Sequence, residues 1–178
     1  MAKTKKDHTH PEYQYLDLLQ DILDNGVVKH DHNTSMGLTS VFGRQMRFDL
    51  SKGLPLLTTK KVSWNSIMHE LYWFMSGQTN IKYLVDHKVP IWNDYPYKIY
   101  CRKSDKGEFP KLTLEEFVAK IGVDEKFAKE HGELPRIYGE QWRAWPAADG
   151  RKIDQLAWVI DTLKNFPERK HAILSAWN

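Results

Sequence analysis

Residues 64–76 carry the pattern that most restricts how this chain folds. Ser63 fits a helix N-cap and Gly77 fits a helix stop, so the segment predicts one helix. Six large side chains form a wide apolar arc on it, and Trp73 lies apart beyond Glu70; the arc consists of Trp64, Ile67, Met68, Leu71, Phe74 and Met75. A helix of this kind is stable only when its apolar face packs against other elements, so the chain needs a core.

The composition supports such a core. The chain has 178 residues and 20.9 kDa, with 41% hydrophobic and 12% aromatic residues, which is one domain's worth of material and excludes a largely disordered chain. The 26 Lys and Arg and the 23 Asp and Glu are interleaved and leave a net charge of +3. That balance argues against dedicated nucleic-acid binding and against a membrane-surface protein.

The single cysteine and the first residues bear on the compartment. Cys101 cannot form an internal disulfide or a cysteine-rich zinc site, which favours a reducing, cytoplasmic setting. The N-terminal lysines have no apolar stretch behind them, so we expect no signal peptide and no membrane span. We expect residues 1–10 to form a flexible tail and residues 11–178 to form one domain.

Apolar periodicity predicts the other elements. They are helices over 12–25, 80–87 and 154–165, a loop over 29–37, strands over 38–42, 46–50 and 172–177, and an extended segment over 89–92. We expect Gly26 to end the first helix in a left-handed conformation. Because domains rarely finish on an apolar strand, we expect the sequence to be the first part of a longer domain.

Residues 97–133 differ from the rest because they are charged and weakly apolar. Thr113 and Glu116 form a capping box, and Asp124 marks a second helix start. A segment of roughly 35 residues cannot bury a core of its own. The sequence therefore predicts a helical surface insertion here.

Few residues suggest chemistry by themselves. The pairs His8/His10 and His30/His32 lack a third ligand at useful spacing, and Cys101 has no histidine partner, so we expect no metal site and no catalytic role for Cys101. Glu70 between apolar neighbours is either a proton carrier or a helix-boundary carboxylate that reaches solvent. The aromatic residues either line a flat ligand site or belong to the core; they are Trp92, Tyr95, Tyr138, Trp142 and Trp145.

Six segments, in order along the chain, resemble thymidylate synthase. They are SVFGRQMRF at 40–48, PLLTTKK at 55–61, HELYWF at 69–74, GQTNI at 77–81, YGEQWR at 138–143 and SAWN at 175–178. The resemblance implies an α/β (α+β type) fold with a large twisted mixed sheet flanked by helices, here truncated, in a homodimer. It also implies methylation of dUMP to dTMP with 5,10-methylenetetrahydrofolate as co-substrate, giving dihydrofolate.

The resemblance also assigns roles by position. Glu70 corresponds to the glutamate that organises proton transfer around the uracil O4, and Tyr138 to the tyrosine near the nucleophile. The folate contacts correspond to Lys60, Ser63, Ile91, Trp92 and Tyr95. The phosphate-binding arginines correspond to Asn33, Lys170 and His171, which are not arginines. Asn93 and Tyr95 also depart from the family, which has an acidic residue and a tryptophan there.

The resemblance also implies that the family's nucleophile is absent from residues 1–178. The family's nucleophilic cysteine lies beyond the SAWN segment, and Cys101 does not replace it, so we expect residues 1–178 alone to be inactive. Two alternatives stay open at this point: a paralogue such as a pyrimidine hydroxymethylase, and a catalytically inactive fragment that dimerises.

Overall fold

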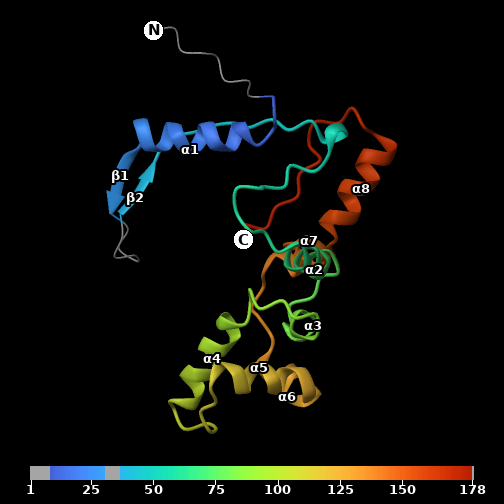
Figure 1. Cartoon of the computed structure of the whole chain (residues 1–178). Helices are drawn as coiled ribbons and strands as arrows, with labels where there is room; N and C mark the ends of the chain where they lie inside the picture. Colours follow the sequence, from blue (N-terminus) through green and yellow to red (C-terminus); the bar gives the residue numbers. More distant parts are fainter. Residues whose placement is uncertain (1–8, 31–36, 178) are drawn as a thin grey trace. The chain divides into compact units, whose positions relative to one another are not determined.

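A computed structural model describes residues 9–30 and 37–177 (Figure 1). The helices are α1 (Tyr13–Asn25), α2 (Trp64–Met75), α3 (Lys82–Asp86), α4 (Asp94–Ser104), α5 (Leu114–Val123), α6 (Glu125–His131), α7 (Tyr138–Arg143), α8 (Gln155–Asn165) and the 3-10 helix η1 (Leu50–Lys52). The strands are β1 (Val27–His30), β2 (Gly37–Ser40), β3 (Trp145–Pro146) and β4 (Lys152–Ile153). The mixed helix and strand class is confirmed, and so are the four helices predicted from apolar periodicity.

The chain divides into two compact units, Met1–Val62 and Ser63–Asn178. That both belong to one domain stays a prediction. Across the described residues, the helices are all too short or too polar to cross a bilayer.

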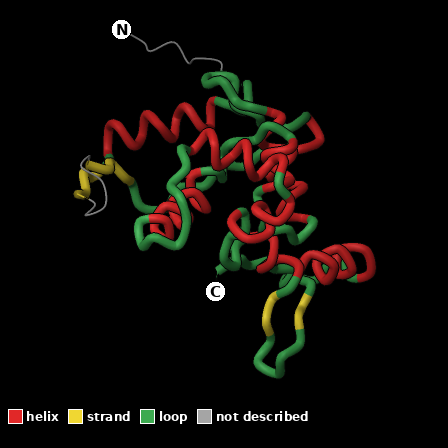
Figure 2. Tube along the Cα trace, turned by 90° about the horizontal axis from the view of Figure 1, so that it is seen from below, coloured by secondary structure: helices red, strands yellow, loops and turns green. Residues whose placement is uncertain are grey.

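The sheets are smaller than expected. Within the described residues, β1 pairs with β2 and β3 with β4, both antiparallel, and these two pairs are the yellow segments of Figure 2. The predicted strand over 172–177 is wrong, because these residues belong to no strand in the described part of the chain. Instead, Gln155 acts as its partner: Nε2 donates to the Ser175 carbonyl at 2.8 Å, and Oε1 accepts from the Ser175 amide at 3.0 Å. The large sheet of the expected fold is therefore not formed by these residues.

In the first unit, α1 runs into the β1–β2 hairpin. Gly26 is extended (φ −73°), so the predicted left-handed stop is wrong. A β-carbon there would lie 2.3 Å from the Ile22 carbonyl oxygen, which means that close packing requires the glycine. The predicted loop begins later than residue 29, since β1 continues to His30.

The predicted strand over 46–50 is also wrong. The Arg47 amide donates to Oε1 of Gln14 at 2.8 Å, so a side chain of α1 takes the bond that a strand partner would take. Asp49 then caps η1 by accepting from the Ser51 amide at 3.1 Å. Alternating apolar residues without a neighbouring strand remain a loop.

The carboxylate of Glu12 fastens the start of α1 to residues 58 and 59. Its oxygens accept bonds from the amide and hydroxyl of Thr58 (2.7 and 2.5 Å) and from those of Thr59 (both 3.0 Å). Glu12 is 8% exposed. The Thr58 hydroxyl, followed by the Thr59 amide, lowers the pKa of Glu12 from 4.5 to about 2.

We expect this contact to make the stability of the first unit depend on pH. Because the pKa of Glu12 is lower in the folded chain, its stabilising contribution is complete above pH 4.5 and is lost as the pH falls toward 2. Glu12→Gln should therefore flatten the change in urea midpoint between about pH 5 and about pH 2.5. Asp24→Asn, at an exposed carboxylate of α1, is the control. An unchanged pH dependence in Glu12→Gln would contradict the expectation.

The core of the second unit includes side chains from the segment predicted to be a surface insertion. Phe117 and Ile121 of α5 are fully buried, and Phe127 and Ala128 of α6 are nearly so. The remaining buried hydrophobic residues are Trp73, Ile81, Leu84, Val89, Tyr100 and Leu134. The helical character and the capping box are confirmed. The surface location is not what the structure shows, because α5 and α6 share their apolar faces with α3 and α4.

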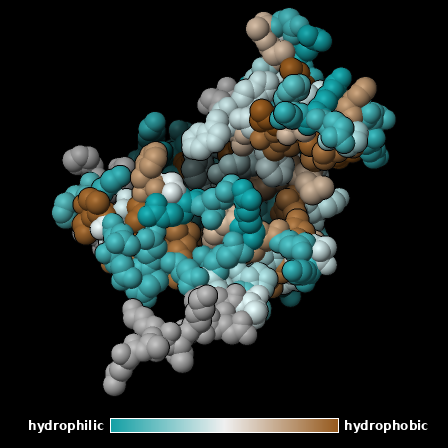
Figure 3. All heavy atoms as spheres, turned by 90° about the horizontal axis from the view of Figure 1, so that it is seen from above, coloured by the Kyte–Doolittle hydropathy of each residue, from teal (hydrophilic) through white to brown (hydrophobic). Residues whose placement is uncertain are grey.

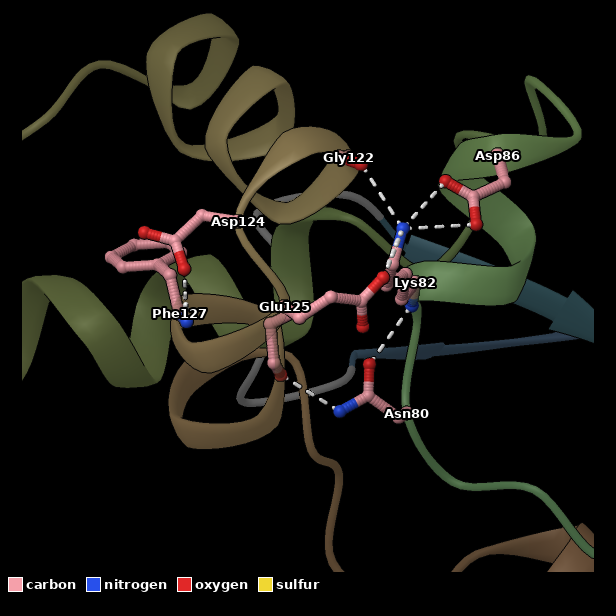
Figure 4. Close-up of polar contacts among 8 residues, drawn as sticks. Asn80, Lys82, Asp86, Gly122, Asp124, Glu125 and Phe127 are labelled. Carbon is pink, nitrogen blue, oxygen red and sulfur yellow. Dashed lines mark hydrogen bonds and ion pairs between the residues drawn. The ribbon is translucent and has the colours of Figure 1, made fainter.

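A lysine at the start of α3 joins these helices (Figure 4). Lys82 Nζ lies 3.1 Å from both carboxylate oxygens of Asp86, 3.0 Å from the Gly122 carbonyl oxygen and 3.4 Å from Oε1 of Glu125. The hydrogen bond to Asp86 raises the pKa of Lys82. Asn80 adds a bond from Nδ2 to the Ala128 carbonyl at 2.8 Å. A cation beside the last carbonyls of α5 is favoured by the helix dipole, so α3, α5 and α6 are held together.

The α2 helix begins and ends as predicted, but its buried side is not the predicted one. Ser63 caps it, and Gly77 follows it with φ of +74°. The apolar arc is exposed by 38–48% at Trp64, Ile67, Met68, Leu71 and Met75. Trp73 is instead fully buried, and its Nε1 donates to the Asn80 carbonyl at 2.9 Å. Figure 3 shows hydrophobic residues at the surface in brown.

Candidate functional site

Glu70 and Trp92 meet between α2 and the turn before α4. Trp92 Nε1 donates to Oε1 of Glu70 at 2.7 Å, and both side chains are half-buried. The predicted extended segment over 89–92 is wrong at its end, since 91–93 form a turn that swings Trp92 toward α2. An indole N–H can only donate, so its natural partner is a carboxylate oxygen. One oxygen of Glu70 is thus held in place.

Aromatic rings surround this pair. The Phe74 ring lies 5.0 Å from that of Tyr138, 6.2 Å from that of Trp92 and 5.8 Å from that of Trp142. Tyr138 is also 6.1 Å from Trp92, edge to face. We call Glu70, Phe74, Trp92, Tyr138 and Trp142 the Phe74 cluster. Since Tyr138 is 45% exposed, the cluster is open to solvent on that side.

The predicted folate contacts are only partly gathered at this cluster. Ile91 and Tyr95 flank Trp92 and are 53% and 50% exposed, so they are accessible to a ligand. Ser63 is occupied as the cap of α2, where its hydroxyl accepts the Ser66 amide at 3.3 Å. Lys60 is exposed and belongs to the first unit. The structure therefore brings together Glu70, Trp92 and Tyr138, with Ile91 and Tyr95 as neighbours of Trp92 along the chain.

The predicted phosphate positions lie near the end of the chain. Lys170 and His171 are exposed, and Asn33 lies outside the described residues. The neighbouring Arg169 places its guanidinium 4.0 Å from the centre of the Phe166 ring. Arg169 is thus stacked on Phe166 in this structure.

The sequence profile of the family described as thymidylate synthase matches residues 13–178. The chain belongs to this family. A protein of Phytoplasma mali named thymidylate synthase is 51% identical over 164 residues, 92% of this chain and 54% of that protein. Proteins with the same name from Zymomonas mobilis and Rhizobium rhizogenes are 47% and 45% identical, over 94% and 95% of this chain and 55% and 54% of their own lengths. The chain thus spans about half the length of the curated relatives it matches.

Cys101 is hydrogen-bonded to Tyr97, which is not a member of the Phe74 cluster. It is half-buried on α4 and packs against the core of the second unit. A hydrogen bond between the Cys101 thiol and Tyr97, together with burial, raises the pKa of Tyr97. In the described part of this thymidylate synthase family member, no three His, Cys, Asp or Glu side chains are grouped to hold a metal ion.

A second group of titratable side chains, which no sequence pattern predicted, is formed by His69, Tyr83 and His87. His69 Nδ1 lies 2.9 Å from the Tyr83 hydroxyl, and the His69 and His87 rings are 4.2 Å apart. His87 Nδ1 also lies 2.7 Å from the Tyr83 carbonyl oxygen. His87 is the C-cap residue of α3, and its spacing of four from Tyr83 is a sequence signal that could have paired the two.

Proposed function

We propose that the protein to which this chain belongs methylates dUMP to dTMP with 5,10-methylenetetrahydrofolate and releases dihydrofolate. One observation carries the proposal. Glu70, Trp92 and Tyr138 come from three separate segments of the chain and meet in one partly open cluster. Family membership supports the reaction type, a methyl transfer to a pyrimidine nucleotide.

Each side chain of the cluster has a role that its contacts allow. Glu70 has one oxygen fixed by Trp92, which leaves the other oxygen to hold or pass a proton at the uracil O4. Trp92 is half-buried and its chain neighbours Ile91 and Tyr95 are exposed, so these apolar side chains are available to pack against the folate ring system. Tyr138 is 45% exposed and corresponds to the family's tyrosine near the nucleophile, so its side chain is accessible to the substrate.

A chimera tests this proposal. It joins residues 1–178 to the part of the Phytoplasma mali relative that the chain does not match. This chimera should form dTMP from dUMP and the folate, measured by the absorbance change of dihydrofolate formation. Residues 1–178 alone should form none, because no side chain in them replaces the family's thiolate. Turnover by residues 1–178 that is lost in Cys101→Ser would show that the nucleophile is misplaced, and an inactive, folded chimera would refute the proposal.

We also propose that the phosphate site binds phosphate more weakly than a site built from arginines would. Asn33 is neutral, Lys170 is a point charge and His171 is an imidazole, whereas arginine offers a planar, permanently charged fork. Each charge-assisted bond contributes roughly 1.5 to 3 kcal/mol, so replacing all three positions by arginine should strengthen dUMP binding by several kcal/mol, less than the sum. Exposure of Lys170 and His171 supports contact with a ligand.

Calorimetry on the chimera tests this expectation. Asn33→Arg, Lys170→Arg and His171→Arg together should tighten dUMP binding and leave deoxyuridine binding unchanged, because deoxyuridine has no phosphate. The wild-type chimera should discriminate little between the two ligands. Tight dUMP binding that the arginines do not improve would contradict the expectation.

A homodimer in the cytoplasm completes the proposal. The exposed arc of α2 supports association, since a monomer would leave these large apolar side chains in water. The single cysteine supports a reducing compartment. Sedimentation of the chimera at micromolar concentration should give a dimer, and a monodisperse monomer would count against it.

A further inference from the structure

The contact between α7 and α2 depends on the absence of a side chain at residue 139. Gly139 is buried, and a β-carbon there would lie 2.7 Å from the Gln78 carbonyl oxygen, 3.2 Å from that of Phe74 and 3.3 Å from the Gly77 carbonyl carbon. All three are backbone atoms, which cannot rotate away as a side chain can. Any larger residue would therefore push the whole of α7 away from the end of α2.

Polar bonds also join α7 to α8. Arg143 Nη2 lies 2.9 Å from Oδ2 of Asp154, and Gln155 Nε2 donates to the Gln141 carbonyl at 2.8 Å. The six-residue helix α7 therefore contacts both α2 and α8. The bonds to α8 hold α7 in place along the chain, whereas the backbone contact at Gly139 limits how closely it approaches α2.

The residue directly before Gly139 belongs to the Phe74 cluster. The Tyr138 ring lies 5.0 Å from the ring of Phe74, and the Phe74 carbonyl is one of the groups that Gly139 approaches. A shift of α7 would therefore change the distance of Tyr138 from Phe74 and from Trp92, now 6.1 Å. The contact that limits how closely α7 approaches also fixes this ring.

We propose that Gly139 is a positioning residue that places Tyr138 against Phe74 and Trp92. This rests on the proposed function only for its consequence in turnover, since the placement itself is measurable without activity. Gly122 of α5 provides a matched control, because a β-carbon there would meet only Val85 Cγ1 at 3.6 Å, an ordinary contact.

The placement is tested by fluorine NMR of residues 1–178 labelled with 5-fluorotryptophan. The chain has 7 tryptophans, and Trp92→Phe assigns the Trp92 resonance. Gly139→Ala should shift this resonance and leave that of Trp64 unchanged, whereas Gly122→Ala should shift neither. With Tyr138→Leu already present, Gly139→Ala should cause no further shift at Trp92, because its effect acts through Tyr138.

The proposal would be overturned if the Trp92 resonance did not change in folded Gly139→Ala. It would also be overturned if Gly139→Ala shifted this resonance equally with Tyr138 and with Tyr138→Leu present. If Gly139→Ala does not fold, Asp154→Asn replaces it as the test. This variant keeps the cap of α8 but weakens the bond to Arg143, so Trp92 should keep its wild-type resonance if the glycine contact sets Tyr138. A shift as large as that of Tyr138→Leu would overturn the proposal.

The consequence for turnover is tested separately in the chimera. Gly139→Ala should lower kcat by about a hundredfold, the usual cost of a misplacement of about 1 Å, and should add little to Tyr138→Phe. If Gly139→Ala lowered kcat equally in the wild type and in Tyr138→Phe, its effect on turnover would not act through Tyr138. An inactive wild-type chimera would refute the proposed function and would leave the NMR result standing.

Discussion

Glu70→Gln is expected to lower the turnover of the chimera by at least about a hundredfold without unfolding it, the usual scale for losing positioned acid–base help. The amide keeps the shape of the side chain, and its oxygen can still accept the Trp92 N–H that now lies 2.7 Å from Oε1. What the amide cannot do is carry a proton. The substitution therefore separates proton transfer from packing.

Two further variants make the result specific. Trp92→Phe keeps an aromatic ring but removes the donor to Glu70, so we expect a smaller loss of turnover than for Glu70→Gln. Glu115→Gln is the matched control, because Glu115 is an exposed carboxylate in the first turn of α5. Turnover and thermal unfolding would be measured on all of them. Wild-type turnover in Glu70→Gln would mean that Glu70 is a helix-boundary carboxylate without a catalytic role.

The local features of the fold could be predicted from the sequence, and the pairings between distant segments could not. Four helices begin at residues that the sequence places at helix starts. In each, the side chain of the capping residue accepts a bond from the amide three residues further on; the caps are Ser63, Thr113, Asp124 and Asp154. Such caps depend only on neighbouring residues. The strand over 46–50 failed because pairing requires a partner from elsewhere in the chain.

The buried side of α2 illustrates the same limit. The helical wheel gives the width of the apolar arc but not the direction of the nearest core, and here Trp73 faces the core through its bond to Asn80. At the candidate site, Glu70 stands out because of its apolar neighbours on the helix. Its bond to Trp92, 22 residues away, has no periodic signal, and neither the apolar pattern nor the family resemblance predicted it.

Phe117→Ala is expected to destabilise the second unit by about 3 to 5 kcal/mol, the usual cost of emptying a buried phenylalanine site. The side chain is 0% exposed, and its ring lies 5.2 Å from that of Tyr100 and 5.6 Å from those of Tyr97 and Phe127. These neighbours come from α4 and α6, so no single side chain can fill the cavity left behind.

The size of this loss distinguishes a core segment from a surface insertion. Val123→Ala, in the same helix but at an 86% exposed position, should change the free energy of unfolding by less than about 0.5 kcal/mol. Phe117→Leu keeps most of the volume and should cost about 1 kcal/mol, which provides a folded intermediate case. Urea unfolding followed by circular dichroism measures all three. A loss for Phe117→Ala as small as that for Val123→Ala would mean that α5 does not share the core with α4 and α6.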